Sequence, residues 1–462
     1  MSGIGPIHLV TVTIIIHYNP YFKILMNNLR LLTGLLCVAL AGDGVCSYGR
    51  TVMTLEEIFE SAEANSAQLR PYITAGKEAE QATDVARNDR LPEITTSLSL
   101  SYIGDGFTTK RNFTDYQKAP IPHLGTGLTL NVSQPIYTGG AIKAGIELAE
   151  LKSTAARFET DMQRDNIRFS LACFYLDIYK CYNLRGVIES NIAQARKVLA
   201  EMNARYEQGV ALQNDITRYE LLVSNLELQL IKINNTIDIL NDNLVTTAGL
   251  PVGTVIEPDS AILSRSLPVT TESAWQQAAE VNAPAIRLAR SGVDISRAAE
   301  RLTRSERLPK IGLQATWTID GPILVEVPPI DRNLSYWYVG VGVSYNISSI
   351  FKTDKSLSKS RTAIRQASER YDAVCESVSL GVRADYVRYL EAYEELKTQQ
   401  KSVELAERNY RTTSTRYSAD MALITDMLDA ANAKLDAEQQ LENARINIIY
   451  YYYKLLFITG QI

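Results

Sequence analysis

The feature that most constrains this chain is an internal repeat, because its second half copies its first at a nearly constant offset. The segment Arg90–Ile94 returns as Arg307–Ile311. Other matches, first half then second, are residues 64–65 and 281–282, 104 and 321, 205–206 and 416–417, and 248–249 and 459–460. A duplication of this kind predicts two similar structural units that pack with quasi-symmetry, residues 48–249 and 271–462.

Each unit contains two segments in which apolar residues alternate with small, uncharged polar ones. They cover about residues 95–103, 124–133, 311–319 and 336–347; in the first, Leu98 and Leu100 alternate with Ser97 and Ser99. Strands with one face toward lipid and the other toward a polar lumen give this pattern, and their length suits a tilted crossing of a bilayer. A soluble antiparallel sheet with one wet face remains the alternative.

The rest of each unit is predicted to be helical. A helix precedes each strand pair, and two long helices follow it, at about 140–206 and 211–248 and at about 354–417 and 421–459. From Leu212 onward apolar residues recur in steps of four and three over more than four heptads, which indicates a coiled-coil seam. The seam recurs 211 residues later with Lys434 as its polar interruption. Residues 250–270, rich in Pro, Ser and Thr, are interpreted as a connector, so the fold class is mainly α with a small β part.

Residues 1–47 are predicted to be a leader and signal peptide. Arg30 precedes an apolar core at 31–40, which small residues follow. Met26 is an alternative start, and lipidation of Cys46 is left open. No uninterrupted apolar run of about 18 residues follows this leader.

Composition excludes several functions. The formal net charge is −5 and no basic stripe stands out, so no nucleic-acid partner is predicted. Only 3 histidines occur, two of them in the leader, which argues against a histidine-based metal site or catalytic triad. No nucleophile–base pairing and no phosphate-binding loop appears. We therefore expect no enzyme activity, no cofactor and no metal site.

Four strands cannot close a barrel, and an open sheet edge cannot lie in lipid, because each backbone N–H and C=O there needs a partner. Self-association would supply the missing strands. Three copies give twelve strands, whereas two give eight, whose interior side chains tend to fill. Strand arithmetic alone leaves four copies open.

Three segments carry a family resemblance: Asn131–Gly140, Arg205–Gly209 and Thr425–Asp429. The first resembles the strand-to-helix junction of a known family, which implies that Pro135 ends a strand and that the two glycines open a long helix. The chain resembles the TolC family of outer-membrane efflux proteins over nearly its whole mature length. The internal repeat is itself a trait of that family.

The resemblance implies a homotrimeric channel-tunnel. A 12-stranded β-barrel would cross the outer membrane of a Gram-negative bacterium, and a barrel of coiled-coil helices would extend through the periplasm. A periplasmic adaptor (membrane fusion) protein and an inner-membrane pump would engage the hairpin tips. The predicted function is a passive export duct in a multipart efflux or type I secretion system. The alternative is a structural, periplasm-spanning envelope protein without transport.

Two acidic residues are candidates for the periplasmic aperture. Asp426 and Asp429 are three apart on a predicted helix and therefore share one face. By resemblance they match the paired aspartates that ring the tunnel entrance, where three copies would place six carboxylates that attract cations. A solvated helix end, with acidic residues favoured in its first turn, is the alternative interpretation.

The hairpin turns supply the remaining candidates. Asp420 stands where the family commonly has glycine, and Ala422 stands where some members carry a gating arginine, so Arg416 and Tyr417 are predicted as a different latch. The candidates for docking an adaptor are Arg205, Tyr206, Gly209, Val210, Ala211, Leu212, Asp420 and Met421. For Leu212, burial in the coiled-coil seam competes with exposure at the tip.

Overall fold

The structure is a computed structural model that describes residues 50–259, 261–264, 267, 270–326 and 329–462. The predicted leader and signal peptide, with Met26 and Cys46, lies outside the described residues. Among the residues described, no helix is both long enough and apolar enough to span a bilayer.

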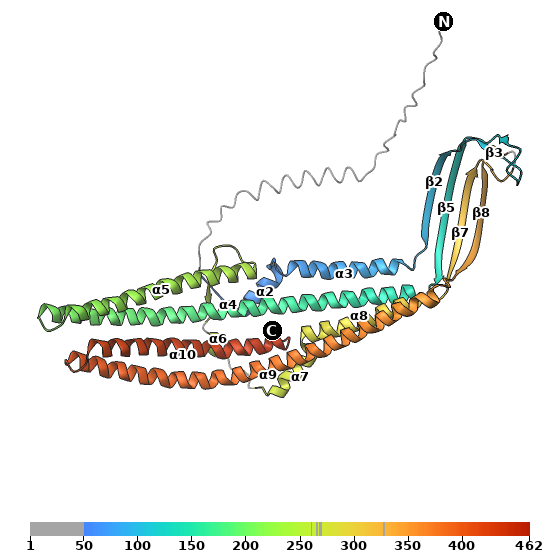
Figure 1. Ribbon diagram of the computed structural model, residues 1–462. Helices are drawn as coiled ribbons and strands as arrows, with labels where there is room; N and C mark the ends of the chain where they lie inside the picture. Colours follow the sequence, from blue (N-terminus) through green and yellow to red (C-terminus); the bar gives the residue numbers. More distant parts are fainter. Residues whose placement is uncertain (1–49, 260, 265–266, 268–269, 327–328) are drawn as a thin grey trace, which may run out of the picture. The chain divides into compact units, whose positions relative to one another are not determined.

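Two helical hairpins dominate the fold (Figure 1). The first joins α4 (Ala141–Glu207) to α5 (Gln213–Ala248), and the second joins α9 (Ser349–Ser418) to α10 (Ile424–Ile458). Helix α4 has 67 residues, which corresponds to about 100 Å at the usual rise. Helix α9 begins at Ser349 rather than at 354, because Asn346 forms a turn that its side chain closes on the N–H of Ser348. The hairpins contact each other through α4 and α10, which leaves α5 and α9 as the two flanks.

The predicted coiled-coil seams hold the hairpins together. Ile216 and Tyr219 are buried in the first seam, as are Met427 and Ala430 in the second. The seam does not include Leu212, whose side chain is 68% exposed. Burial is thus the wrong interpretation of Leu212 within one chain, because Leu212 lies in the extended backbone just before α5 begins at Gln213.

The boundary between the two hairpins combines polar contacts with the apolar clusters that both hairpins share. Lys434 lies 3.1 Å from a carboxylate oxygen of Glu438 and donates to the side-chain oxygen of Gln194 at 3.2 Å. Asn191 donates to Glu438 at 2.7 Å, and a second such contact joins Asn183 to Glu442 at 2.9 Å. The predicted interruption at Lys434 is therefore a partnered side chain, and hydrogen bonds connect α4 to α10 along their contact.

Two short helices, rather than the one predicted, precede each strand pair. They are α2 (Leu55–Asn65) and α3 (Arg70–Asn88) in the first repeat, and α7 (Glu272–Asn282) and α8 (Pro284–Ser305) in the second. Pro284 begins α8, and Pro71 lies in the first turn of α3. At these positions the missing N–H of proline costs nothing, and the proline ring prevents a preceding helix from continuing. Helix α3 packs on α4, and α8 packs between α4 and α9.

In each repeat, the glycine that follows the last long helix lies against the end of a short helix. Gly249 follows α5 in the left-handed conformation (φ 68°), and a Cβ there would lie 2.6 Å from the backbone carbonyl of Asn65. In the second repeat Gly460 has the same φ, and its Cβ would lie 2.6 Å from the carbonyl oxygen of Asn282. Glycine is thus required at both sites by the backbone conformation and by the close approach.

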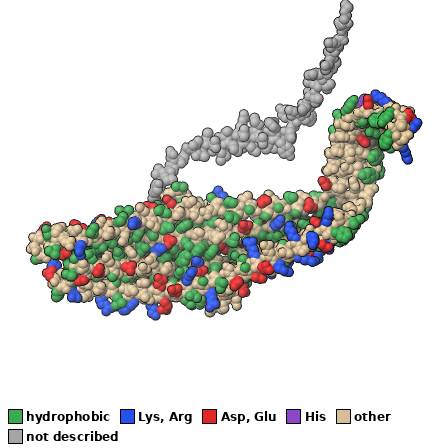
Figure 2. Space-filling model, in the orientation of Figure 1, with side chains coloured by type: hydrophobic (Ala, Val, Ile, Leu, Met, Phe, Trp, Pro, Cys, Tyr) green, Lys and Arg blue, Asp and Glu red, His purple; other side chains and the backbone are tan. Residues whose placement is uncertain are grey.

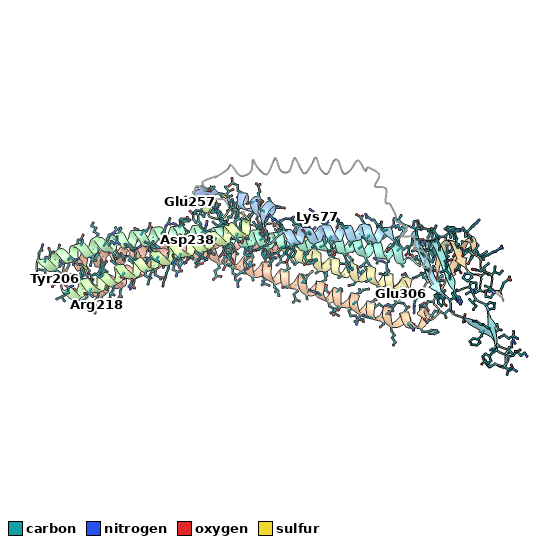
Figure 3. The ribbon with its side chains drawn as sticks, turned by 90° about the horizontal axis from the view of Figure 1, so that it is seen from above. Lys77, Tyr206, Arg218, Asp238, Glu257 and Glu306 are labelled. Carbon is teal, nitrogen blue, oxygen red and sulfur yellow. The ribbon has the colours of Figure 1, made fainter. Side chains whose placement is uncertain are left out.

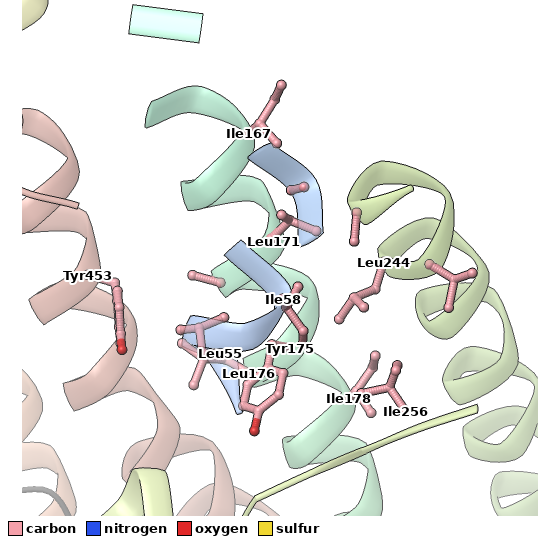
Figure 4. Close-up of a cluster of buried hydrophobic side chains, with 14 of the residues drawn as sticks. Leu55, Ile58, Ile167, Leu171, Tyr175, Leu176, Ile178, Leu244, Ile256 and Tyr453 are labelled. Atoms are coloured by element: carbon pink, nitrogen blue, oxygen red, sulfur yellow. The ribbon is translucent and has the colours of Figure 1, made fainter. Parts of the chain in front are cut away.

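A buried cluster lies where α2, α4 and α5 meet (Figure 4). Ile58, Leu171 and Leu244 are fully buried in it. The hydroxyl of Tyr175 donates to the carbonyl of Met53 at 2.9 Å and accepts from the backbone N–H of Asp259 at 2.7 Å. These bonds hold a two-stranded parallel sheet, β1 (Arg50–Met53) with β6 (Val255–Pro258), so the predicted connector includes a strand and a short helix, α6 (Ala261–Ser264).

Asp165 on α4 carries an unusual carboxyl group near this cluster. Burial raises its pKa to about 6, and the neighbouring carboxylate of Asp161 adds to the rise. The guanidinium groups of Arg168, Arg164 and Arg287 oppose it. The folded chain therefore binds a proton at this position more tightly than the unfolded chain does.

We expect Asp165→Asn to stabilise the protein at mildly alkaline pH. Because the folded pKa lies above the ordinary value, the favourable contribution of this carboxyl is complete below about pH 4 and is lost as pH rises through about 6. The amide removes the charged form, so the gain is about 1–2 kcal/mol per copy at about pH 8, after allowance for partial exposure, and vanishes near pH 4. Thermal unfolding of both proteins across this range checks it. An equal gain at all pH values would contradict the assignment.

The predicted strands form one antiparallel sheet in the order β2–β5–β7–β8. Their bounds are Glu93–Tyr102, Leu124–Tyr137, Lys310–Gly321 and Leu334–Ser344. Strand β5 continues past Pro135, so the expectation that this proline ends the strand is wrong. Pro135 lies opposite Gly312, and the register shifts before Tyr137. Proline is tolerated at such a bulge because no ladder hydrogen bond needs its N–H.

The register aligns like residues across the whole sheet. Leu98 lies opposite Leu128, which lies opposite Ile319, while on the other face Thr129 lies between Ser97 and Thr318. One face is therefore apolar and the other mostly small and polar, with Tyr336 and Tyr338 of β8 as larger side chains opposite Thr318 and Thr316. Figure 2 shows the sheet largely in tan, with few charged side chains on the visible face. The loop predicted between the first two strands contains a short hairpin, β3 (Gly106–Thr108) with β4 (Gln117–Ala119).

Candidate functional site

The two hairpin turns have the same backbone geometry. Gly209 in the first and Asp420 in the second both adopt the left-handed conformation, with φ of 77° and 59°. After each, an N–H returns to the end of the preceding helix, from Val210 to the carbonyl of Arg205 at 3.0 Å and from Met421 to that of Arg416 at 2.8 Å. Each long helix therefore ends in a left-handed cap of the kind that usually requires glycine.

Asp420 occupies this conformation in spite of its side chain, at a cost of about 1 kcal/mol. Its carboxylate forms an ion pair with the guanidinium of Arg205 on the other hairpin. The same guanidinium lies 3.5 and 3.4 Å from the carbonyl oxygens of Tyr417 and Ser418, and 5.9 Å from the centre of the Tyr417 ring. Arg205 thus connects the two hairpin tips.

The predicted latch is only partly assembled in this way. Arg416 donates to the carbonyl of Met421 at 3.4 Å, within its own turn, and among the described residues it forms no hydrogen bond or ion pair with the first hairpin. Tyr417 does lie at the contact between hairpins. Its partial burial and the nearby Asp215 carboxylate raise its pKa, while Arg205 lowers it. Sequence reasoning assigned Arg205 to docking, although an acidic residue at a glycine position was a signal for a charged partner nearby.

Asp426 and Asp429 both lie on the solvent-exposed face of α10. The buried face of the same turns carries Met427 and Ala430. Asp426 accepts a hydrogen bond from the backbone N–H of Leu423 at 3.1 Å, so it also caps the helix. The capping role and a role at an aperture are compatible, because both residues remain exposed.

Apolar side chains are exposed at both tips. In the first turn Val210 and Leu212 are 59% and 68% exposed, and in the second Met421 and Leu423 are 63% and 70% exposed. Tyr206 lies at the same end of the first hairpin, near Arg218 (Figure 3). The spacing predicts Leu423, the repeat counterpart of Leu212, as the first residue of the second seam, and its exposure shows that this placement is wrong within one chain. Within the part of the chain that the structure describes, no three His, Cys, Asp or Glu side chains are grouped to hold a metal.

Comparison with known proteins gives the family of the chain. The sequence pattern of the outer membrane efflux protein family matches residues 58–250 and 275–461. The outer membrane efflux protein BepC of Brucella suis is 22% identical over 430 residues, which cover 92% of this chain and 89% of BepC. The outer membrane protein TolC of Escherichia coli is 20% identical over 437 residues, which cover 91% of this chain and 84% of TolC.

Solved structures show the same fold. The outer membrane protein VceC of Vibrio cholerae superposes with a TM-score of 0.74 at 16% identity, over 88% of this chain and 96% of VceC. The outer membrane channel CmeC of Campylobacter jejuni gives 0.70 at 13% identity, over 88% of this chain and 85% of CmeC. The chain belongs to the outer membrane efflux protein family. It is an efflux channel protein of the outer membrane, with the mainly α fold and small sheet of that group.

Proposed function

We propose that three copies of this chain form a ring that acts as a passive export duct through the outer membrane. The observation that carries the proposal is the sheet, which has one apolar and one polar face and two free edges. Edge strands β2 and β8 are exposed along their whole length, with Leu98 at 82% and Val341 at 65%. A neighbouring copy would pair both edges and place the polar faces around a lumen.

The helical flanks support the same assembly. Helix α5 exposes Leu221, Leu228, Ile231 and Ile239, and helix α9 exposes Leu380, Val387, Leu390 and Leu405. These apolar side chains face away from the buried seam of each hairpin, on the two helices that have a free side. In a ring, α9 of one copy would lie beside α5 of the next, and both sets would be covered. The contact is head-to-tail, so a closed ring leaves no flank exposed.

The exposed tips are proposed to dock a periplasmic adaptor, and through it an inner-membrane pump that supplies the energy. Val210, Leu212, Met421 and Leu423 are apolar and lie at both turns, which suits contact with another helical hairpin. We assign no catalytic step to the chain. A lumen lined by Ser, Thr, Asn and Gly has little chemical selectivity, so we assign the choice of cargo to the pump.

Asp426 and Asp429 are proposed to ring the periplasmic aperture, and Arg205, Tyr417 and Asp420 to hold the tips closed. The proposal is supported by the exposure of both carboxylates just beyond the second turn and by the ion pair between hairpins. Six carboxylates around a narrow opening would attract cations and repel anions.

Conductance in planar bilayers tests the duct and the aperture together. We expect the purified protein to conduct with a cation preference, and Asp426→Asn with Asp429→Asn to reduce that preference several-fold. Asparagine keeps an oxygen for the N–H of Leu423, so the helix cap is preserved. Asp436→Asn, an exposed carboxyl farther along α10, is the matched control and should change little.

Two other results would count against these assignments. A protein that inserts and never conducts would be a structural spacer rather than a duct. A conducting protein whose ion preference is unchanged in the double variant would remove Asp426 and Asp429 from the aperture.

A further inference from the structure

The start of helix α9 carries three lysines on one exposed face. Lys352, Lys355 and Lys359 follow each other in steps of three and four, so their side chains leave the same side of the helix. All three residues are exposed, and within the described part of the chain none of their ammonium groups has an ion-pair or hydrogen-bond partner. These three residues are called the lysine face.

The acidic residue that lies among these lysines is already engaged. Asp354 forms an ion pair with the guanidinium of Arg307, just after α8, and the same guanidinium donates to the carbonyl oxygen of Ile350 at 3.4 Å. These contacts fix the first turns of α9 to the end of α8. Residues 345–361 contain no acidic residue besides Asp354, so the charge of the lysine face is not compensated locally. The net charge of the whole chain, −5, conceals this local excess.

Neither packing nor helix stability accounts for the lysine face. By the offset of 211 that relates the two coiled-coil seams, its counterparts on α4 are Ala141, Ala144 and Leu148. These residues are buried or half-buried, so the same face is apolar in one repeat and cationic in the other. The positive end of the helix dipole disfavours cations near a helix N-terminus, and α9 has no acidic residue in its first turn to offset Lys352.

The lysine face begins where the apolar surface of the sheet ends. On β8 the apolar residues Val341 and Val343 are exposed, and Ile347 and Phe351 continue the exposed apolar surface to the first turn of α9. An apolar strand face, then an exposed aromatic ring, then lysines follow the order of a bilayer, which runs from hydrocarbon through the interface to the headgroups. Lysine suits the last of these layers, because its aliphatic stem lies along apolar surface while its ammonium group reaches outward.

We propose that the lysine face binds anionic phospholipids in the leaflet of the outer membrane that faces the periplasm. The three lysines extend over about 10 Å of helix, which is similar to the depth of one headgroup layer. Each lysine close to an anionic lipid surface favours binding about fivefold, so three together give roughly a hundredfold preference over zwitterionic lipid. Salt weakens this preference, because the charges are exposed. The inference needs the outer-membrane location of the chain and does not depend on the export of any cargo.

Lipid binding to the full-length, detergent-extracted protein tests the proposal. We expect a fluorescent phosphatidylglycerol to bind roughly a hundredfold more tightly than the matching phosphatidylcholine, and Lys352→Gln with Lys355→Gln and Lys359→Gln to remove most of this preference. Glutamine keeps the helix propensity of lysine. Arg361→Gln with Arg365→Gln is the matched control on exposed residues of the same helix. Arg361 comes two and a half turns after Lys352, on the opposite face, so this variant should keep the preference.

Ion preference in planar bilayers separates a lipid-facing position of the lysines from a position in the lumen. An unchanged ion preference in the triple variant, together with the lost lipid preference, is the expected result. A triple variant that becomes more cation-selective and still prefers phosphatidylglycerol would overturn the proposal, because its lysines would then line the lumen. Equal affinity of the parent protein for the two lipids, or an equal loss in the control variant, would overturn it as well. A protein that never conducts but shows the expected lipid preference would reject the duct and support this inference.

Discussion

Gly249→Ala is expected to destabilise the protein by about 2–4 kcal/mol per copy, the largest effect of any single-methyl change considered for this chain. An alanine there must adopt a left-handed backbone, and its methyl group would lie 2.6 Å from the carbonyl of Asn65 at the end of α2. Backbone atoms cannot move aside as a flexible side chain can, so α2 must shift away from α5. Loss of the helical circular dichroism signal on heating measures the effect.

Two other glycines separate the causes. Gly209 is also left-handed, but a methyl group there would meet nothing within 4 Å, so Gly209→Ala should cost only the backbone strain, about 1 kcal/mol. Gly186 lies inside helix α4 with open space around it, so Gly186→Ala should stabilise the chain by up to about 1 kcal/mol. Equal losses for Gly249→Ala and Gly209→Ala would show that the contact with Asn65 contributes nothing.

Arg205→Ala is expected to open the periplasmic end of the duct. The guanidinium is the group that joins the first hairpin to Asp420 and to the carbonyl oxygens of the second turn. Loss of about 1.4 kcal/mol of charge-assisted contact would raise the ratio of open to closed tips about tenfold. Single-channel recordings should show a larger or more frequently open conductance.

Asp420→Gly is the informative companion to this variant. Glycine relieves the left-handed strain at φ 59° while it removes the same ion pair, so the turn itself becomes more stable. We expect an increase in open conductance similar to that of Arg205→Ala, without loss of thermal stability. Arg416→Ala, whose side chain bonds only within its own turn, should leave the conductance close to that of the parent. A larger effect of Arg416→Ala than of Arg205→Ala would contradict the latch.

Periodicity determines how much of this fold the sequence predicts. The alternation of Leu98 and Leu100 with serines, and the four-three spacing from Ile216 onward, are set by burial on one face, so strands and long helices were predicted with their faces. Ends were less accurate. Pro135 is compatible with continued pairing because it lies beside a bulge, and α9 starts at Ser349 because Asn346 forms a turn. The ends of these elements depend on the neighbouring segment that each one contacts. The sequence of a single strand or helix does not determine that neighbour.

The tip shows the same limit. Spacing alone placed Asp426 and Asp429 on one face, and the structure leaves both exposed. The sequence spacing could not show that Arg205 rather than Arg416 contacts the other hairpin. That contact depends on how two turns far apart in the sequence lie against each other. The break before Pro284 was readable, since a proline after Asn282-Ala283 disfavours a continuous helix.

The polar contact between α4 and α10 has a consequence for how the wall can deform. Water can replace Asn191, Gln194 or Glu438 as a hydrogen-bond partner at little net cost, whereas nothing can replace the apolar neighbours of Met427 or Tyr219. Each helical pair should therefore stay intact as a stiff rod when the wall is strained. At the line through Lys434 and Glu442 the polar contacts can exchange partners with water, but full separation of the two rods would expose the apolar clusters that they share, so this boundary should allow small shifts rather than separation.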